Sequence, residues 1–100
     1  MKFRFHPEAL AEFGEAALFY TSRRPGLGDE FTDEVYATVR RILVQTDRWR
    51  FLEEPVRRCL TRRFPHGVLY VEEPGGILIV AVMHLRREPG YWRSRLNNPN

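Results

Sequence analysis

Residues 67–85, GVLYVEEPGGILIVAVMHL, decide the fold of this 100-residue chain. Two apolar segments, 67–72 and 77–85, flank Glu73-Pro74-Gly75-Gly76, whose proline and glycines are typical of a tight turn. We therefore predict two antiparallel strands joined as a hairpin. The second segment is a nearly unbroken apolar run. Such a run is typical of a strand covered on both faces, so we expect it in the middle of the sheet.

A third strand is expected on the N-terminal side of this hairpin, over residues 56–64. The turn Pro65-His66-Gly67 joins it to the next strand, so the last three strands should form an antiparallel meander. Residues 47–55 show no clear period and are interpreted as a loop. The C-terminal part is expected to comprise a break at Glu88-Pro89-Gly90, a short helix or extended tail over 91–96, and a frayed end over 97–100.

The N-terminal half is expected to be a strand followed by two helices. Residues 2–6 alternate polar and apolar side chains, as in a half-buried strand. Helices are predicted over 7–22 and 29–46 from apolar residues at spacings of three and four, and the break at 23–28 contains a proline and two glycines. The two apolar faces comprise Leu10, Phe13, Ala17 and Tyr20, then Phe31, Val35, Val39 and Ile42.

The predicted fold is a single α+β domain over residues 1–100. Its order is one strand, a two-helix hairpin and the three-stranded meander. The helices must cover one face of a curved sheet, because their apolar faces have no other surface to bury against. We expect the opposite face to remain open to solvent and available for binding.

Composition excludes some classes of protein. Hydrophobic residues make up 43% of the chain and charged residues 29%, which argues against a disordered chain. No segment approaches the length of a bilayer span, and the start lacks an apolar segment of signal-peptide length. We therefore expect a cytoplasmic protein that does not enter a membrane. The single cysteine, Cys59, cannot form an internal disulfide and is expected to be buried in a strand.

The charge is divided unevenly along the chain. Residues 1–47 carry six basic and eight acidic groups, whereas residues 48–100 carry ten arginines and five acids. Fifteen of the sixteen basic residues are arginines, whose planar guanidinium makes forked contacts with carboxylate and phosphate. The basic half is therefore expected to bind an anion, either nucleic acid or an acidic protein segment. Candidate anion-binding residues are Arg58, Arg63, Arg87, Trp92, Arg93 and Arg95.

A second group of residues could cleave RNA. That reaction needs a base for the 2′-hydroxyl proton, cations for the phosphorane and an acid for the leaving oxygen. His84 could act as base or acid, Arg62 or Arg86 as the cation, and Tyr91 as an acid or a stacking group. In the alternative interpretation, His84 is a hydrogen-bonded structural residue, and Tyr91 and Trp92 close the end of a core.

Other chemistries lack support in the sequence. The three histidines, including His66, which we expect near the opposite end of the sheet from His84, have no metal-ligand spacing. No carboxylate pair or glycine-rich phosphate loop is present. We therefore predict no metal and no nucleotide cofactor.

Four segments together resemble the RelE/ParE toxin superfamily. They cover nearly the whole chain in order, and the superfamily fold agrees with the one predicted above. The resemblance implies the toxin of a type II toxin–antitoxin module, often a plasmid stabilisation system, that inhibits growth until a cognate antitoxin wraps it. The segments are Phe5-His6-Pro7-Glu8-Ala9-Leu10-Ala11-Glu12, Arg24-Pro25-Gly26-Leu27-Gly28-Asp29-Glu30-Phe31, Arg62-Arg63-Phe64-Pro65-His66-Gly67-Val68-Leu69-Tyr70 and His84-Leu85-Arg86-Arg87-Glu88-Pro89-Gly90-Tyr91-Trp92.

The superfamily contains two activities. RelE-like members cut messenger RNA in the ribosome, usually with an arginine in the strand before the hairpin and further lysines or arginines. Here the matching stretch 67–70 has no basic residue and Lys2 is the only lysine, so the chain resembles ParE more closely. ParE-like members poison DNA gyrase, and the resemblance then implies an effector surface over residues 86–95. The alternatives are a ribosome-dependent endoribonuclease and a binding partner that has lost toxicity.

Overall fold

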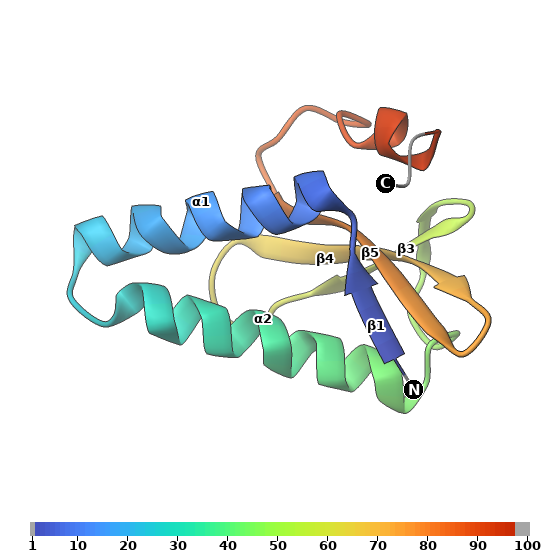
Figure 1. Ribbon diagram of the computed structural model, residues 1–100, viewed down its shortest axis with the longest axis horizontal. Coiled ribbons are helices and arrows are strands. Elements are labelled where there is room, and N and C mark those ends of the chain that lie inside the picture. The colour runs from blue at the N-terminus through green and yellow to red at the C-terminus, as the bar shows by residue number, and fades with distance from the viewer. Residues whose placement is uncertain (1, 98–100) are drawn as a thin grey trace.

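The computed structural model describes residues 2–97 and has the predicted α+β architecture (Figure 1). One five-stranded sheet has the strand order β1-β5-β4-β3-β2. Strand β1 pairs in parallel with β5, and every other pair is antiparallel. The elements are β1 (Lys2–Phe5), α1 (Pro7–Arg23), α2 (Leu27–Val44), β2 (Phe51–Glu53), β3 (Val56–Leu60), β4 (His66–Glu73), β5 (Gly76–His84) and the 3-10 helix η1 (Arg93–Leu96).

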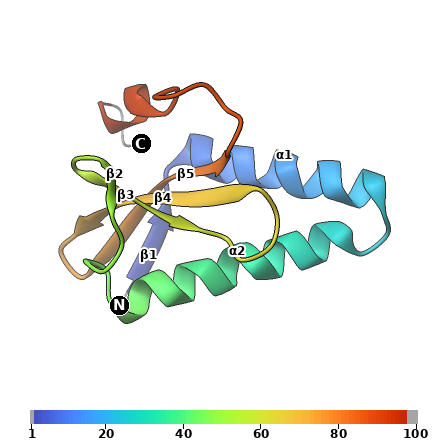
Figure 2. The ribbon, with the colours of Figure 1, turned by 180° about the vertical axis from the view of Figure 1, so that it is seen from behind.

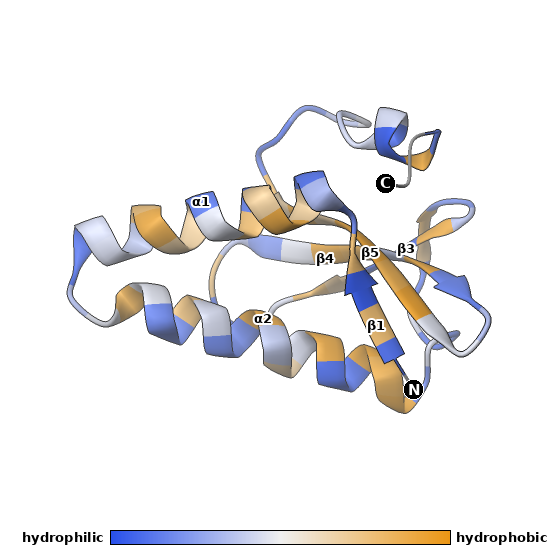
Figure 3. Ribbon diagram, in the orientation of Figure 1, coloured by the Kyte–Doolittle hydropathy of each residue, from blue (hydrophilic) through white to orange (hydrophobic). Residues whose placement is uncertain are grey.

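The hairpin of β4 and β5 forms the centre of the sheet, as predicted. Strand β5 lies between β1 and β4, and its first eight residues are buried (Figure 3 shows its apolar character). A register irregularity between Leu69 and Tyr70 changes which side chains of β5 face the helices. Ile79 and Val82 both belong to the helix-side core, whereas Val80 and Ala81 belong to the cluster on the other face.

The two helices cover one face of the sheet. Proline suits the first turn of α1, and the His6 ring caps this helix, because its Nδ1 accepts a 3.0 Å hydrogen bond from the amide of Glu8. The helices approach closely at Gly28, where a Cβ atom would lie 2.5 Å from the carbonyl oxygen of Ala17. Phe13, Phe31, Val35, Val39 and Ile42 are buried as expected. Leu10 is 53% exposed, so its assignment to the apolar face is wrong.

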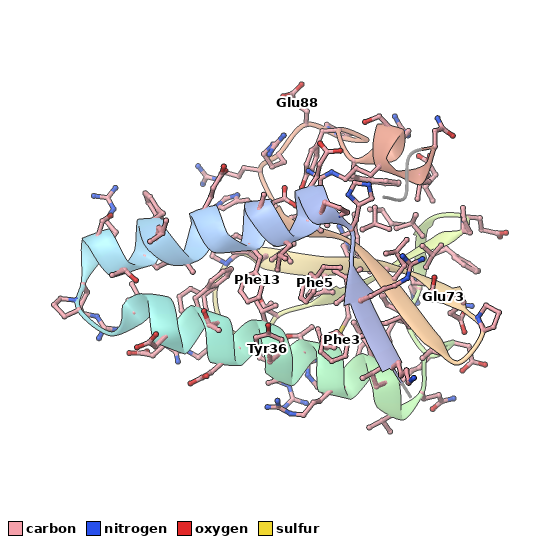
Figure 4. The ribbon with its side chains drawn as sticks, viewed as in Figure 1. Phe3, Phe5, Phe13, Tyr36, Glu73 and Glu88 are labelled. Atoms are coloured by element: carbon pink, nitrogen blue, oxygen red, sulfur yellow. The ribbon has the colours of Figure 1, made fainter. Side chains whose placement is uncertain are left out.

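An aromatic cluster joins β1 to the helices. The rings of Phe5 and Phe13 stack with centroids 5.8 Å apart, and Tyr36 of α2 lies edge-on to Phe13 at 5.6 Å (Figure 4). Phe3 extends the cluster along β1 and contacts Tyr36 at 6.3 Å. Such edge and stacked pairs contribute beyond the area they bury. They fix the edge strand under the helical hairpin.

The other face of the sheet is only partly open, which corrects the expectation of a solvated surface. After β5 the chain crosses back over the sheet (Figures 1 and 2), and the indole of Trp92 is 2% exposed. Trp92 packs in a second core cluster that includes Val56, Leu69 and Val80. Burial of so large an apolar side chain stabilises the returning segment. The interpretation of Trp92 as the closure of a core is confirmed.

Several boundaries differ from the sequence expectation. The expected loop 47–55 contains the short strand β2, and β3 ends at Leu60 rather than at residue 64, where Phe64 adopts a positive φ of 72°. Helix α2 begins two residues early, after Gly26 at φ 85°, and ends at Val44. The frayed end predicted for 97–100 lies outside the described residues except for the exposed Asn97. Over residues 2–97, no helix combines the length and apolar character of a bilayer span.

Candidate functional site

A pocket of about 370 Å³ lies between α1 and the ends of β4 and β5. Val82 and Ala16 contribute apolar walls, and two histidines face each other across the strand pair. The lining residues are Glu12, Glu15, Ala16, Phe19, Tyr20, His66, Val82, His84 and Arg87. The pocket therefore combines an apolar surface with titratable groups.

His66 and His84 are direct neighbours, which corrects the expectation that they lie at opposite ends of the sheet. They are register partners in β4 and β5, and their ring centroids are 5.1 Å apart. The reason is the tight turn at Pro74-Gly75, which makes residues equally distant from it pair across the hairpin. Counting back from this turn places His66 opposite Met83, and the register irregularity between Leu69 and Tyr70 shifts its partner by one residue to His84.

His66 is neutral at physiological pH. Its side chain is buried against the ring of Phe31, with centroids 4.7 Å apart, and the Tyr20 hydroxyl lies 3.1 Å from its Nε2. Within residues 2–97, its Nδ1 has no hydrogen-bond partner. Burial, with a further contribution from the charge of His84, lowers the pKa of His66 to about 4. Burial also raises the pKa of the Tyr20 hydroxyl.

His84 is oriented by the turn that follows β5. Its Nδ1 accepts a 3.0 Å hydrogen bond from the amide of Arg86, and the amide of Leu85 donates to the carbonyl oxygen of Pro65 at 2.9 Å. The neutral ring therefore carries its proton on Nε2. That atom can donate to an acceptor in the pocket, so His84 is a positioned hydrogen-bond donor there.

Glu12 of α1 holds the returning C-terminal segment. Its carboxylate accepts hydrogen bonds from the Val82 amide at 3.0 Å, from Arg95 at 2.9 Å and from the Tyr91 hydroxyl. Arg87 lies 3.6 Å from the same carboxylate, and its guanidinium also stacks 3.7 Å from the centre of the Tyr91 ring. We call Glu12, Arg87, Tyr91 and Arg95 the clasp. Burial and the Glu12 carboxylate raise the pKa of Tyr91 well above its usual value.

The structure does not gather the four RNA-cleavage candidates into one site. His84 lies in the pocket beside α1, whereas Arg62 lines a separate hollow with Trp49. Arg86 is exposed, and its contact with His84 is made by its backbone amide. The Tyr91 hydroxyl is bound to Glu12. A base, a cation and an acid are thus not aimed at one point.

The anion-binding candidates fall into three groups. Trp92 and Arg95 are buried and are not on the surface, because the first packs on the sheet and the second donates to the Val80 carbonyl at 2.9 Å. Arg63, Arg87 and Arg93 are exposed but paired with Glu30, Glu12 and Glu53, respectively. Arg58 is half-buried and lines a hollow at β2 and β3 without an acidic partner in the lining.

Gly90 shapes the path of the C-terminal segment. Its φ of 76° lies in the left-handed region, which glycine adopts without strain. The Arg93 guanidinium packs against it so closely that a Cβ atom would lie 2.0 Å from Nη1. Arg93 is thereby directed to Glu53, with Nε–Oε2 and Nη2–Oε1 distances of 2.8 and 2.6 Å.

Sequence reasoning missed Glu12 and His66. Glu12 lies outside the apolar spacing of α1, and nothing local marks its partners, which lie 70 to 83 residues away. For His66, the short hairpin turn indicates a position near the end of β5, close to His84. Across residues 2–97, no three His, Cys, Asp or Glu side chains come together as a possible metal site.

A helical hairpin on one face of a five-stranded sheet, with a basic C-terminal segment returning over the other, is the architecture expected for the RelE/ParE class of toxins. Residues 3–89 match the family model described as the ParE toxin of the type II toxin–antitoxin system, parDE. The chain therefore belongs to the ParE toxin family. No match was found among curated proteins. Membership of the family implies a cognate antitoxin as a partner.

Proposed function

We propose that this chain is a cytoplasmic toxin that inhibits DNA gyrase and is neutralised by its cognate antitoxin. The observation that carries the proposal is an exposed basic segment after β5, while the RNA-cleavage candidates His84 and Arg62 line different pockets. Family membership supports the toxin role. The gyrase target goes further than the family match: it is what the resemblance to ParE-like members implies, and the exposed basic segment after β5 supports it.

Arg86 and Arg87 are the proposed centre of the effector surface. Both are exposed in the turn after β5, and the carboxylate and ring of the clasp hold Arg87 in place. A guanidinium held in advance loses less side-chain entropy when it binds an acidic partner. Trp92 and Arg95 act indirectly in this proposal, because they are buried and fix the segment.

The endoribonuclease alternative has weaker support. Arg62 and His84 line different pockets, and the pKa of Tyr91 is raised by burial and by Glu12, so its hydroxyl is a poor acid for a leaving group. A gyrase inhibitor needs no such set, because it acts by binding. The separation of these side chains therefore favours binding over RNA cleavage.

The antitoxin is expected to cover apolar side chains that α1 leaves exposed. Leu10, Leu18 and Phe19 are 53%, 72% and 51% exposed. Exposed apolar residues on a helix suit an amphipathic segment of a partner, and the basic C-terminal half suits an acidic one. We propose that the antitoxin supplies both features in one chain.

A supercoiling assay tests the gyrase proposal. Purified toxin is titrated into gyrase with relaxed plasmid, and we expect supercoiling to fall at excess toxin. The double variant Arg86→Gln/Arg87→Gln should weaken inhibition by about tenfold or more, as loss of central charged contacts does. The matched control Arg23→Gln/Arg24→Gln removes two exposed charges at the turn between the helices and should inhibit like the wild type. Full gyrase activity at excess toxin, with cleavage of ribosome-bound transcripts instead, would contradict the proposal.

A further inference from the structure

Two hollows lie beside each other at the β2–β3 edge of the sheet and the end of α2. The larger, of about 490 Å³, is lined by Arg48, Trp49, Arg50, Phe51, Arg58 and Leu60. The smaller, of about 190 Å³, is lined by Arg41, Val44, Arg48, Trp49 and Arg62. They share Arg48 and Trp49. We call this continuous surface the basic edge.

The basic edge has five guanidinium groups and no carboxylate in its lining. Within residues 2–97, the side chains of Arg48, Arg50, Arg58 and Arg62 form no ion pair. The fifth arginine, at position 41, donates to neutral groups such as the Leu60 carbonyl oxygen. A cluster of unpaired guanidiniums repels itself, so it favours the binding of an anion.

Glu34 contacts the backbone beside this surface and, in the part of the chain that the structure describes, forms no ion pair with the cluster. The Glu34 carboxylate accepts from the backbone amides of Arg62 and Arg63. It therefore fixes the loop after β3, and the Arg62 guanidinium stays available at the smaller hollow. The positive charge of the edge is thus presented by a loop that is itself held in place.

Aromatic rings are interleaved with these arginines. In the run Arg48-Trp49-Arg50-Phe51 the two types alternate, and the Arg48 guanidinium lies 5.0 Å from the centre of the Trp49 ring. Phe51 is 44% exposed, and Arg57 stacks 3.9 Å from its ring centre. Rings and guanidinium planes of this kind are surfaces on which nucleobases stack, while free guanidiniums bind phosphate.

We propose that the basic edge binds single-stranded nucleic acid, without sequence specificity, through phosphate contacts and base stacking. An acidic peptide fits this edge less well. A peptide that binds a sheet edge extends its backbone ladder, but β2 has only three residues and a register shift against β3. Nucleic acid needs no ladder, because its phosphates and bases use the side chains. The basic edge lies apart from the Arg86–Arg87 surface, so the proposal does not depend on gyrase inhibition.

Fluorescence anisotropy tests this proposal with fluorescein-labelled oligothymidine and oligouridine of equal length. We expect the purified toxin to bind at low salt and to release the oligonucleotides as salt rises, because bound counterions are exchanged. Binding of both strands would identify the shared backbone and base chemistry, and preference for one would identify the source as DNA or RNA. The variant Arg50→Gln/Arg58→Gln should bind about tenfold more weakly or worse and lower the salt slope by roughly 1.4, for two lost phosphate contacts. Arg23→Gln/Arg24→Gln, with the same net charge, should bind like the wild type.

Tryptophan fluorescence supplies a second readout that reports stacking. The chain has two tryptophans, and Trp92 is buried in the second core cluster, so quenching by unlabelled oligothymidine should come from Trp49. Trp49→Phe should remove the quenching and keep most of the binding. Three results would overturn the proposal: no binding at low salt, equal losses in both double variants, or equal competition by polyglutamate of matched charge.

Discussion

The clasp and the basic edge place the same residue type in opposite situations. In the clasp, Arg87 and Arg95 surround one carboxylate, and the Arg95 side chain is 9% exposed. At the basic edge, Arg48, Arg50 and Arg58 line a hollow that contains no acid. The difference lies in Glu12, which reaches the C-terminal segment from α1. Arg95, whose side chain is enclosed beside this carboxylate, becomes part of the fold, Arg87 touches the same carboxylate from an exposed position, and the arginines of the basic edge belong to the surface.

The charge that the toxin exposes differs from the charge of its sequence. The acidic N-terminal half supplies the carboxylate that fixes the basic C-terminal half, so the charge asymmetry of the sequence is partly cancelled inside the molecule. Among the exposed basic residues, Arg86 and Arg87 lie after the end of β5, and the basic edge lies at β2 and β3. The two surfaces can therefore bind different anionic partners.

The largest effect is expected from Glu12→Gln. Glutamine keeps the shape but removes the charge, so the guanidinium of Arg95 would remain buried without a counter-charge. Removal of one partner of such a pair costs about 3 kcal/mol in the free energy of unfolding. Urea denaturation measures this loss, and acrylamide quenching of Trp92 should rise if the segment detaches.

Glu15→Gln is the matched control for the clasp. Glu15 is the next acid on α1 and is exposed, so its loss should leave the urea midpoint nearly unchanged. A second variant sharpens the test. Glu12→Gln combined with Arg95→Met removes both charges and should recover much of the lost stability, because the uncompensated cation is gone. Equal destabilisation by the Glu12 and Glu15 variants would mean that the clasp is only a surface contact.

The next largest effect is a loss of unfolding free energy at acidic pH, caused by His66 in the pocket that Glu12 also lines. His66 has a pKa of about 4 in the folded protein, and an unfolded histidine titrates near 6.5, so the unfolded chain binds more protons between these values. The stabilising contribution of neutral His66 is complete above pH 6.5 and is lost as the pH falls toward 4. Between pH 7 and pH 5 this loss amounts to about 2 kcal/mol.

His66→Phe isolates that effect from other titrations. Phenylalanine fits the aromatic surroundings of Tyr20 and Phe31 and removes the Nδ1 that lacks a partner in the described structure. We expect the variant to match the wild type near pH 7 and to be the more stable protein at pH 5. Parallel curves of unfolding free energy against pH for the two proteins would show that His66 does not cause the acid sensitivity.

The fold could be predicted where the signal is local. The hairpin of residues 67–85 has its turn and both strands in one stretch of sequence, and Phe31, Val35 and Val39 follow one helical period. Strand β2 could not be predicted in the same way. Its three residues are all exposed, so no apolar alternation marks them, and their pairing depends on β3.

The candidate site was harder to predict, because its geometry depends on distant contacts. In the sequence, Glu12 cannot be distinguished from the other acids of α1. Its contacts with Tyr91 and Arg95 depend on the path of the C-terminal segment. In the sequence, Trp92 and Arg95 look like residues of a binding surface. In the structure both are buried, because the ring packs in the second core cluster and the guanidinium meets Glu12. His66 differs, since the turn length places it near the end of β5, although its exact pairing with His84 depends on the register irregularity between Leu69 and Tyr70.

The smallest effects on stability are expected from single exposed arginines, and their signs separate an arginine paired with a carboxylate from one at the basic edge. Arg93 forms a forked pair with Glu53 that is open to solvent, so Arg93→Gln should lower the urea midpoint only slightly. Arg50 lies among like charges at the basic edge, so Arg50→Gln should leave the midpoint unchanged or raise it slightly at low salt. Added salt should reduce both changes, because it screens attraction and repulsion alike. If Arg50→Gln instead destabilised the protein as much as Arg93→Gln, Arg50 would be held by an attractive interaction like that of Arg93 with Glu53, and the distinction between the unpaired arginines of the basic edge and the paired arginines would fail.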